Sequence, residues 1–173
     1  MYNLSNDEIK IAGVVKESIV DGPGIRYTIF TQGCPHHCNG CHNPQTHDFN
    51  AGSFVRISKI VEDIQKDPLL KGITISGGEP FMQAKKIATL ISNLDRKKLN
   101  VMVYSGFEYE YLVKNANDEN GYMDLLRSAD ILIDGKFEID QKSEKLPFRG
   151  SLNQRSIDLN KSLESGNTVL YEF

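Results

Sequence analysis

The apolar residues of this chain follow two spacings in turn, one typical of helices and one typical of buried strands. Apolar side chains recur three and four positions apart over residues 57–66 and again over residues 81–94, which predicts two amphipathic helices. Short apolar runs bounded by glycine, proline or asparagine predict strands. These are residues 9–16, 26–31, 72–76, 101–104 and 130–134, with candidate edge strands at 155–159 and 168–173. Two short helices are predicted at residues 109–114 and 122–127.

This alternation of strands and helices indicates βαβ units and a mostly parallel sheet. A complete eight-unit barrel takes ~250 residues, so this chain has room for about five or six strands. We therefore predict an α/β fold, namely an incomplete (βα) barrel of mostly parallel strands. The pattern fades into loop from residue 138 onward. No repeat, low-complexity segment or linker divides the chain, so we expect a single domain over residues 1–173.

Composition narrows the class of protein. Charged residues make up 25% of the 173 residues and hydrophobic residues 39%, which is ordinary for a soluble globular domain. The formal net charge of -3 gives no indication of binding to nucleic acid or to an anionic membrane. Residues 1–10 are polar and lack the apolar core of a signal peptide, and no run approaches membrane-spanning length.

All three cysteines fall within residues 31–44, which read TQGCPHHCNGCHNP. Cys34, Cys38 and Cys41 have the spacing Cys-x3-Cys-x2-Cys, which suits a metal centre better than a disulfide, because a disulfide would leave one thiol unpaired. A structural zinc site needs four protein ligands, so a histidine would have to complete it. The candidates are His36, His37, His42 and His47.

An iron–sulfur cluster is the other interpretation of this spacing, and the cysteines alone do not decide between the two metals. Clusters usually take four cysteines, so three would leave one iron open to a small molecule. That open iron would let the cluster take part in chemistry as well as carry electrons. Either site fits a reducing compartment, and we expect a cytoplasmic protein.

The cysteine spacing resembles the signature of the radical S-adenosylmethionine superfamily, and further segments narrow the resemblance. In chain order they read VDGPGIR at 20–26, GCHNP at 40–44, SGGEP at 76–80, LIDGKF at 132–137 and FRGSLNQR at 148–155. This series is similar to the activating proteins of anaerobic (class III) ribonucleoside-triphosphate reductase, and it covers nearly the whole chain. The chain departs from that family in lacking tryptophan, since His47 and Phe148 stand where relatives often carry one.

The resemblance implies a radical S-adenosylmethionine type of fold and a set of cofactors. Cys34, Cys38 and Cys41 would form the catalytic centre by binding a 4Fe-4S cluster in which one iron is not bound by protein. That iron would take S-adenosyl-L-methionine, whose reductive cleavage gives methionine and a 5′-deoxyadenosyl radical. The activity would be that of an oxidoreductase that generates a glycyl radical on the reductase. The implied partners are the glycine-bearing loop of the reductase and a one-electron donor such as reduced flavodoxin.

Gly77, Gly78 and Glu79 follow a predicted strand, and a Gly-Gly turn by itself is a weak signal. One interpretation is a strand-to-helix turn, with Glu79 placed favourably near a helix N-terminus. The resemblance implies a different role, in which this backbone and carboxylate bind the methionine ammonium. A carboxylate is the natural partner for that charge.

The resemblance assigns further contacts beside the cysteines. Gly40, Cys41 and His42 would line the adenine end of the site through their backbone. The turn at residues 21–24 is poor in side chains and precedes the cysteine segment; by itself it reads as a tight hairpin turn. With Arg26 just beyond it, this turn is also a place where the glycine loop of a protein substrate would rest.

Ser105, Asp134 and Lys136 follow predicted strands and complete the candidate site. Residues two apart on a strand share a face, so Asp134 and Lys136 would point the same way, toward the cofactor carboxylate or ribose as the resemblance implies. The alternative for these two is a surface ion pair, which would contribute little. A polar loop further on would bind the partner, close the open end of the barrel, or only stabilise itself. Its residues of interest are Arg149, Asn153 and Gln154.

Two other functions stay open on the sequence. The first is activation of another glycyl radical enzyme of the pyruvate formate-lyase type, although those activating proteins tend to be longer and the RGS sequence at residues 149–151 argues against it. The second is a zinc or iron–sulfur binding module without turnover.

Overall fold

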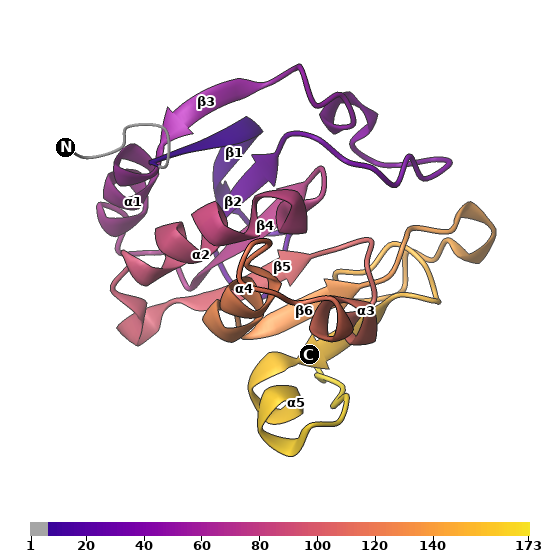
Figure 1. Ribbon diagram of the computed structural model, residues 1–173. Helices are drawn as coiled ribbons and strands as arrows, with labels where there is room; N and C mark the ends of the chain where they lie inside the picture. Colours follow the sequence, from indigo (N-terminus) through magenta and orange to yellow (C-terminus); the bar gives the residue numbers. More distant parts are fainter. Residues whose placement is uncertain (1–6) are drawn as a thin grey trace.

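The computed structural model describes residues 7–173, apart from the side chain of Lys97. A sheet of seven strands in the order β3-β1-β2-β4-β5-β6-β7 forms its centre (Figure 1). The strands are β1 Glu8–Ser18, β2 Arg26–Thr31, β3 Ser53–Arg56, β4 Gly72–Gly77, β5 Asn100–Tyr104, β6 Ile131–Asp134 and β7 Arg155–Asp158. The α-helices are α1 Ile57–Gln65, α2 Ala84–Ser92, α3 Tyr109–Lys114, α4 Tyr122–Ser128 and α5 Leu159–Ser165. The polar segment 1–10 considered above lies partly outside the described residues.

The sheet has a parallel centre and antiparallel edges. β2, β4, β5 and β6 pair in parallel, as the alternating pattern predicted. β1 and β3 are added antiparallel beside β2, and β7 is added antiparallel beside β6. The α/β class is therefore confirmed. The sheet has seven strands where about five or six were expected, and β3 is the strand that was not predicted. Its curvature into an incomplete barrel stays a prediction.

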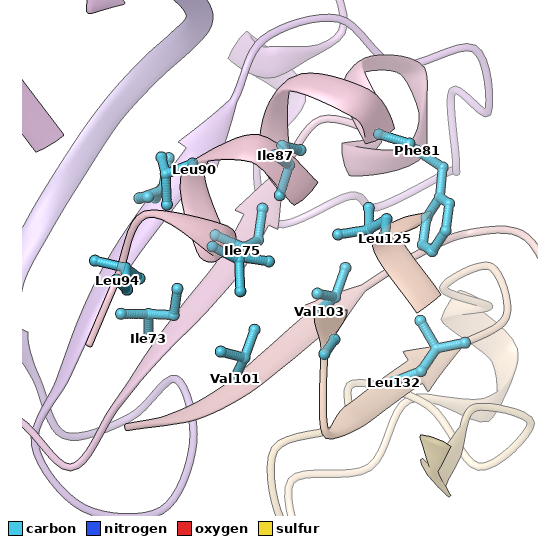
Figure 2. Close-up of a cluster of buried hydrophobic side chains, with 14 of the residues drawn as sticks. Ile73, Ile75, Phe81, Ile87, Leu90, Leu94, Val101, Val103, Leu125 and Leu132 are labelled. Carbon is cyan, nitrogen blue, oxygen red and sulfur yellow. The ribbon is translucent and has the colours of Figure 1, made fainter. Parts of the chain in front are cut away.

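One face of the sheet packs against the helices. Alternate residues of a strand point to opposite faces, so Ile73 and Ile75 of β4 share this face with Val101 and Val103 of β5. Figure 2 shows these side chains beneath Leu90 of α2. Burying an aliphatic side chain of this size contributes about 1.5–3 kcal/mol, and the cluster extends over most of the sheet. This core holds the strands, and therefore their carboxyl ends, in fixed register.

The opposite face carries a smaller apolar cluster and several polar residues. Met102, Ile131 and Ile133 are buried there, and Tyr104 and Tyr171 pack against them. Among the described residues, no helix has the length and apolar character needed to cross a membrane.

Prediction and structure differ in three segments. β3 was not predicted, because three of its four residues are exposed and it lacks a buried face. The helix α5 was also missed, because only Leu159 and Ser162 within it are buried. Residues 168–173 do not form a strand and contribute a single bridge, between Leu170 and Ile157.

Candidate metal centre

The segment that contains the cysteines leaves the carboxyl end of β2, beside the ends of β4, β5 and β6. Figure 1 shows that this loop and the loop after β6 extend from the same side of the sheet. Cys34, Gly78, Ser105 and Lys136 each follow one of these strands, and all four line a single cavity of about 600 Å³. Strand ends of this kind are where α/β folds usually bind their ligands.

Hydrogen bonds fix both ends of the cysteine loop. The N–H of Cys34 donates to the carbonyl of His47 at 3.1 Å. The amide nitrogen of the Gln32 side chain donates to the carbonyl of Asp48 at 2.7 Å. Because residues 32–34 and 47–48 are tied together, the cysteines lie on a closed loop with a defined orientation.

The three cysteines are free thiols that line the same cavity. Burial raises the pKa of the Cys34 thiol, and hydrogen bonds from the backbone N–H groups of His36 and His37 partly offset this. Burial also raises the pKa of Cys38, against a backbone hydrogen bond from Phe137. Coordinated thiols are deprotonated by the metal itself, so these N–H groups would stabilise the sulfur of a metal ligand.

The arrangement of ligands fits a cluster. Zinc requires four ligands around one ion. Within residues 7–173, neither the three cysteines nor any other three His, Cys, Asp or Glu side chains are grouped around a single ion position. The rings of His37 and His47 instead contact each other, with centroids 5.0 Å apart. A cluster binds each cysteine to a different iron, and Cys34, Cys38 and Cys41 all border a cavity in which a further iron position would be accessible.

Gly77 and Gly78 bring the end of β4 against the cysteine loop. Gly77 has φ +95°, and a Cβ atom there would lie 2.5 Å from the backbone nitrogen of Thr31. A Cβ atom on Gly78 would lie 2.4 Å from the carbonyl oxygen of Gly33. Only glycine allows so close an approach. Both glycines line the cavity, whereas Glu79 is fully buried and its carboxylate accepts hydrogen bonds from protein groups.

Asp134 and Lys136 have different surroundings in the structure. Asp134 is 1% exposed and accepts hydrogen bonds from Arg155 Nε at 3.0 Å and from the N–H of Tyr109 at 2.8 Å. The alternative of a surface ion pair between Asp134 and Lys136 is therefore wrong, because the carboxylate is buried and its partner is Arg155. Lys136 is exposed and lines both the main cavity and a neighbouring one of about 480 Å³, which Asp134 also borders.

Gly40 and His42 lie against residues that follow β6. Gly40 has φ +74°, and a Cβ atom there would lie 2.8 Å from the Ile139 side chain. The ring of His42 packs against Phe137, with centroids 4.9 Å apart, and both line the cavity. The segment after β6 therefore forms a wall opposite the last two cysteines.

The polar loop before β7 is held by its own side chains. The side-chain oxygen of Gln154 accepts from the N–H of Gly150 at 2.8 Å, and its amide nitrogen donates to the carbonyl of Gly135 at 3.0 Å. Arg149 donates to the carbonyl of Gln154 at 2.9 Å, and Asn153 Nδ2 donates to the carbonyl of Lys136 at 2.8 Å. These contacts support a role in stabilising the loop, and because Arg149 and Gln154 also line the cavity, the loop covers part of its opening.

The sequence interpretation placed Arg26 beside a surface that would contact the partner protein, but the structure places it in the interior. Its side chain is fully buried and donates to Thr74 Oγ1 at 2.7 Å and to the carbonyl of Ile73 at 2.6 Å. A further bond to the carbonyl of Pro23, at 3.1 Å, attaches the turn at residues 21–24 to the sheet. The guanidinium is therefore part of the scaffold and cannot contact a partner protein directly.

Comparison with known proteins identifies the family. A family model described as a 4Fe-4S single cluster domain matches residues 20–157. The chain is 34% identical to the anaerobic ribonucleoside-triphosphate reductase-activating protein of Haemophilus influenzae over 146 residues, which cover 79% of this chain and 89% of that protein. The protein of the same name from Escherichia coli K12 is 32% identical over 145 residues, 79% of this chain and 90% of its own. The chain belongs to the family of anaerobic ribonucleoside-triphosphate reductase-activating proteins.

Membership of the activating-protein family confirms the resemblance drawn from the sequence and supports an iron–sulfur cofactor. The relative from Enterobacteria phage T4, with the same name, is 29% identical over 143 residues, 79% of this chain and 85% of its own. The crystal structure of QueE from Escherichia coli aligns with a TM-score of 0.45 and 17% identity, covering 61% of this chain and 57% of that chain. A likeness of that extent is too partial to decide the fold.

Several residues that line the cavity of this activating-protein family member were not predicted from the sequence. Phe30, Ser76 and Tyr104 line the cavity from within their strands. Leu146 and Phe148 line it from the loop after β6. Strand alternation could have identified the first group, because each of them points to the face opposite the helices. The loop has no periodicity, so its place over the cavity was only one of three roles considered for its polar residues, and Leu146 and Phe148 were not among them.

Proposed function

We propose that this chain activates an anaerobic ribonucleoside-triphosphate reductase by generating a glycyl radical on it, through reductive cleavage of S-adenosyl-L-methionine. The observation that carries the proposal is the convergence of the three cysteines and the ends of four parallel strands on one cavity, in a chain of the activating-protein family. A cavity of about 600 Å³ is within the usual range for binding a small molecule.

Cys34, Cys38 and Cys41 would hold a 4Fe-4S cluster, with one iron left for the substrate. When bound and reduced, the cluster supplies one electron to the sulfonium, which splits S-adenosyl-L-methionine into methionine and a 5′-deoxyadenosyl radical. The protein contributes position and exclusion of water, while the cofactors carry the difficult chemistry. A hydrogen atom then moves from a glycine Cα of the reductase to that radical, which leaves 5′-deoxyadenosine and the glycyl radical.

Other lining residues have roles that follow from their chemistry. Gly77 and Gly78 present backbone groups without side chains, so a ligand can approach them closely. The ammonium of Lys136 is suited to the methionine carboxylate. His42 and Phe137 offer aromatic faces near Cys41, which suits an adenine ring.

The openness of the cavity favours a protein as the final substrate. Val20, Lys142 and Glu144 are exposed and also line the cavity, so it reaches the surface of the molecule. A glycine loop of the reductase would close this opening during the reaction and would bring its Cα–H to the radical. Glycine suits that role because it has no side chain to obstruct the approach. The electron would come from a separate one-electron donor such as reduced flavodoxin.

The test is an electron paramagnetic resonance assay under anaerobic conditions. Reconstituted protein, a reductant, S-adenosyl-L-methionine and the reductase should together give the glycyl doublet, and omission of any one should remove it. A reductase whose radical-site glycine is replaced by alanine is the matched control. If pyruvate formate-lyase is activated and the reductase is not, the substrate assignment is wrong.

A metal analysis separates the proposal from a binding module. Anaerobically purified protein should contain iron and sulfide in equal amounts, with little zinc. Protein that holds zinc and remains active in air would contradict an oxygen-sensitive cluster with an open iron.

A further inference from the structure

The carboxylate of Glu79 is fully buried and is surrounded by donors from the protein itself. It accepts hydrogen bonds from the N–H of Phe81 at 3.0 Å and the N–H of Gly106 at 2.8 Å. The hydroxyl of Ser105 donates to both of its oxygens, at 3.0 and 3.1 Å. The fourth donor is His36 Nε2, at 2.7 Å. A carboxylate has about four acceptor positions, so these contacts occupy its capacity.

His36 connects this carboxylate to the cysteine loop. It lies between Cys34 and Cys38 in the sequence, and its side chain is 6% exposed. An ionised carboxylate only accepts, so the tautomer of His36 that forms this hydrogen bond carries its proton on Nε2. A hydrogen bond to a buried carboxylate is shorter and stronger than a bond between neutral groups. The loop is therefore attached through this ring to the ends of both β4 and β5.

The ring of His36 fits a slot that the surrounding residues form. Its edge meets the ring of Phe107, with centroids 4.5 Å apart and planes at 73°. On the other side stands Gly106, where a Cβ atom would lie 2.4 Å from the His36 ring. A side chain at that position would displace the histidine, so the glycine leaves room for it.

The backbone beside this ring faces the first cysteine. The backbone N–H groups of His36 and His37 lower the pKa of the Cys34 thiol, against the effect of its burial, so they face its sulfur. Hydrogen bonds to sulfur and solvent exposure are among the features that tune an iron–sulfur cluster. A displaced His36 ring would move its own N–H and would alter both the hold on Cys34 and the electronic state of a bound cluster.

We propose that Glu79 and His36 form a positioning pair, in which the buried carboxylate holds the first part of the cysteine loop against the ends of β4 and β5. In this arrangement the carboxylate serves the protein and does not bind the ammonium of the substrate. This inference rests on the proposed function for its cluster. It gives Glu79 a different role from the one that the sequence resemblance implied.

The experiment compares reconstituted variants of the complete protein. His36→Asn is too short to reach Glu79, whereas His36→Gln places an amide N–H near the position of Nε2. His37→Asn is the matched control, because His37 lies on the same loop, is exposed, and contacts His47 instead. Glu79→Gln keeps the size of the side chain but replaces one acceptor oxygen by an NH2 group. In the variant this donor would face N–H groups from which the wild-type carboxylate accepts hydrogen bonds.

Three quantities are measured for each variant: the rate at which a chelator removes iron, the electron paramagnetic resonance spectrum of the reduced cluster without S-adenosyl-L-methionine, and the dissociation constant of S-adenosyl-L-methionine. His36→Asn and Glu79→Gln should each raise the rate of iron loss about tenfold or more, as expected for a lost charged hydrogen bond. Both should also change the spectrum. His36→Gln should restore most of the wild-type behaviour, and His37→Asn should match the wild type.

The double variant His36→Asn with Glu79→Gln provides the sharpest test. If the two side chains act as a pair, it should lose iron no faster than the worse single variant. Weaker binding of S-adenosyl-L-methionine by Glu79→Gln, with unchanged iron loss and an unchanged spectrum, would overturn the proposal. So would wild-type behaviour of His36→Asn. A wild-type protein that retains its cluster but forms no glycyl radical refutes the proposed function alone, because iron loss and the spectrum require neither cleavage nor the reductase.

Discussion

Replacing Arg26 by methionine is expected to weaken the fold and not to remove a contact with the reductase. The guanidinium donates to Thr74 Oγ1 at 2.7 Å, to the carbonyl of Ile73 at 2.6 Å and to the carbonyl of Asn100 at 3.1 Å. These acceptors belong to β4 and β5, so a single side chain links three strands. The bond to Pro23 adds the preceding turn to the same network.

The magnitude follows from two opposing effects. Each hydrogen bond to a charged group contributes about 1.5–3 kcal/mol. Burial opposes them: it lowers the pKa of Arg26 from its ordinary value to about 10, which costs the charged form on the order of 3 kcal/mol. Methionine removes that cost but leaves buried acceptors without donors. We expect the free energy of unfolding to fall by about 2–4 kcal/mol, which lowers the melting temperature of a chain of this length by about 4–16 °C.

Urea unfolding of Arg26→Met and of the wild type measures this difference. Arg56→Met is the control, because Arg56 is exposed at the end of β3 and its loss should change the free energy of unfolding by no more than about 0.5 kcal/mol. At a temperature where Arg26→Met is still folded, its glycyl radical yield should fall, relative to the wild type, only in proportion to any fall in its iron content. An Arg26→Met variant that is as stable as the wild type and keeps its cluster, but forms no glycyl radical, would refute this reasoning.

Three further predictions test the metal ligands, the slot and an ion pair. Cys34→Ala should abolish cleavage, measured as 5′-deoxyadenosine by chromatography; full cleavage would contradict the ligand assignment. Gly106→Ala should displace the ring of His36 and reduce the bound iron, so an unchanged iron content would show that the slot is not required. The Arg155 side chain lowers the pKa of Glu110 to about 2, so the stability from this pair is present above about pH 4.5 and is lost as the pH falls toward 2. The difference in urea stability between wild type and Glu110→Gln should shrink over that range, and a constant difference would contradict it.

The periodicity of the sequence predicted the elements whose side chains are buried. The strands β2, β4, β5 and β6 have mostly buried residues, and α1 has a continuous buried face. These are the elements on which hydrophobic spacing acts directly. The strand β3 and the helix α5 depend on pairing and on a few contacts with distant segments, so their own residues contain little signal. Parallel order was also predictable, whereas the antiparallel edges were not, because hydrophobic spacing does not determine strand direction.

The residues of the candidate site likewise divide into those that the sequence could assign and those that it could not. The three cysteines could be assigned from sequence because their chemistry depends on spacing within one loop. The loop after β6 could not, since its place over the cavity depends on bonds such as that from Gln154 to Gly135, 19 residues away. Arg26 shows the same difficulty, because its contact with Asn100 spans 74 positions. The sequence identifies a charged side chain but does not identify the distant group that forms hydrogen bonds with it.

Glu79 and Asp134 show why that limitation matters at this site. Both follow parallel strands, and the sequence resemblance implied that both would meet the cofactor. A buried carboxylate is stable only when donors surround it, and strand ends are where neighbouring strands can supply those donors. Glu79 takes donors from the cysteine loop and from the segment that follows β5, and Asp134 takes its donors from Arg155 and the start of α3. The same convergence that creates a binding cavity therefore also satisfies these carboxylates within the protein, so a charge at a strand end becomes evidence for a ligand only once its protein partners are known.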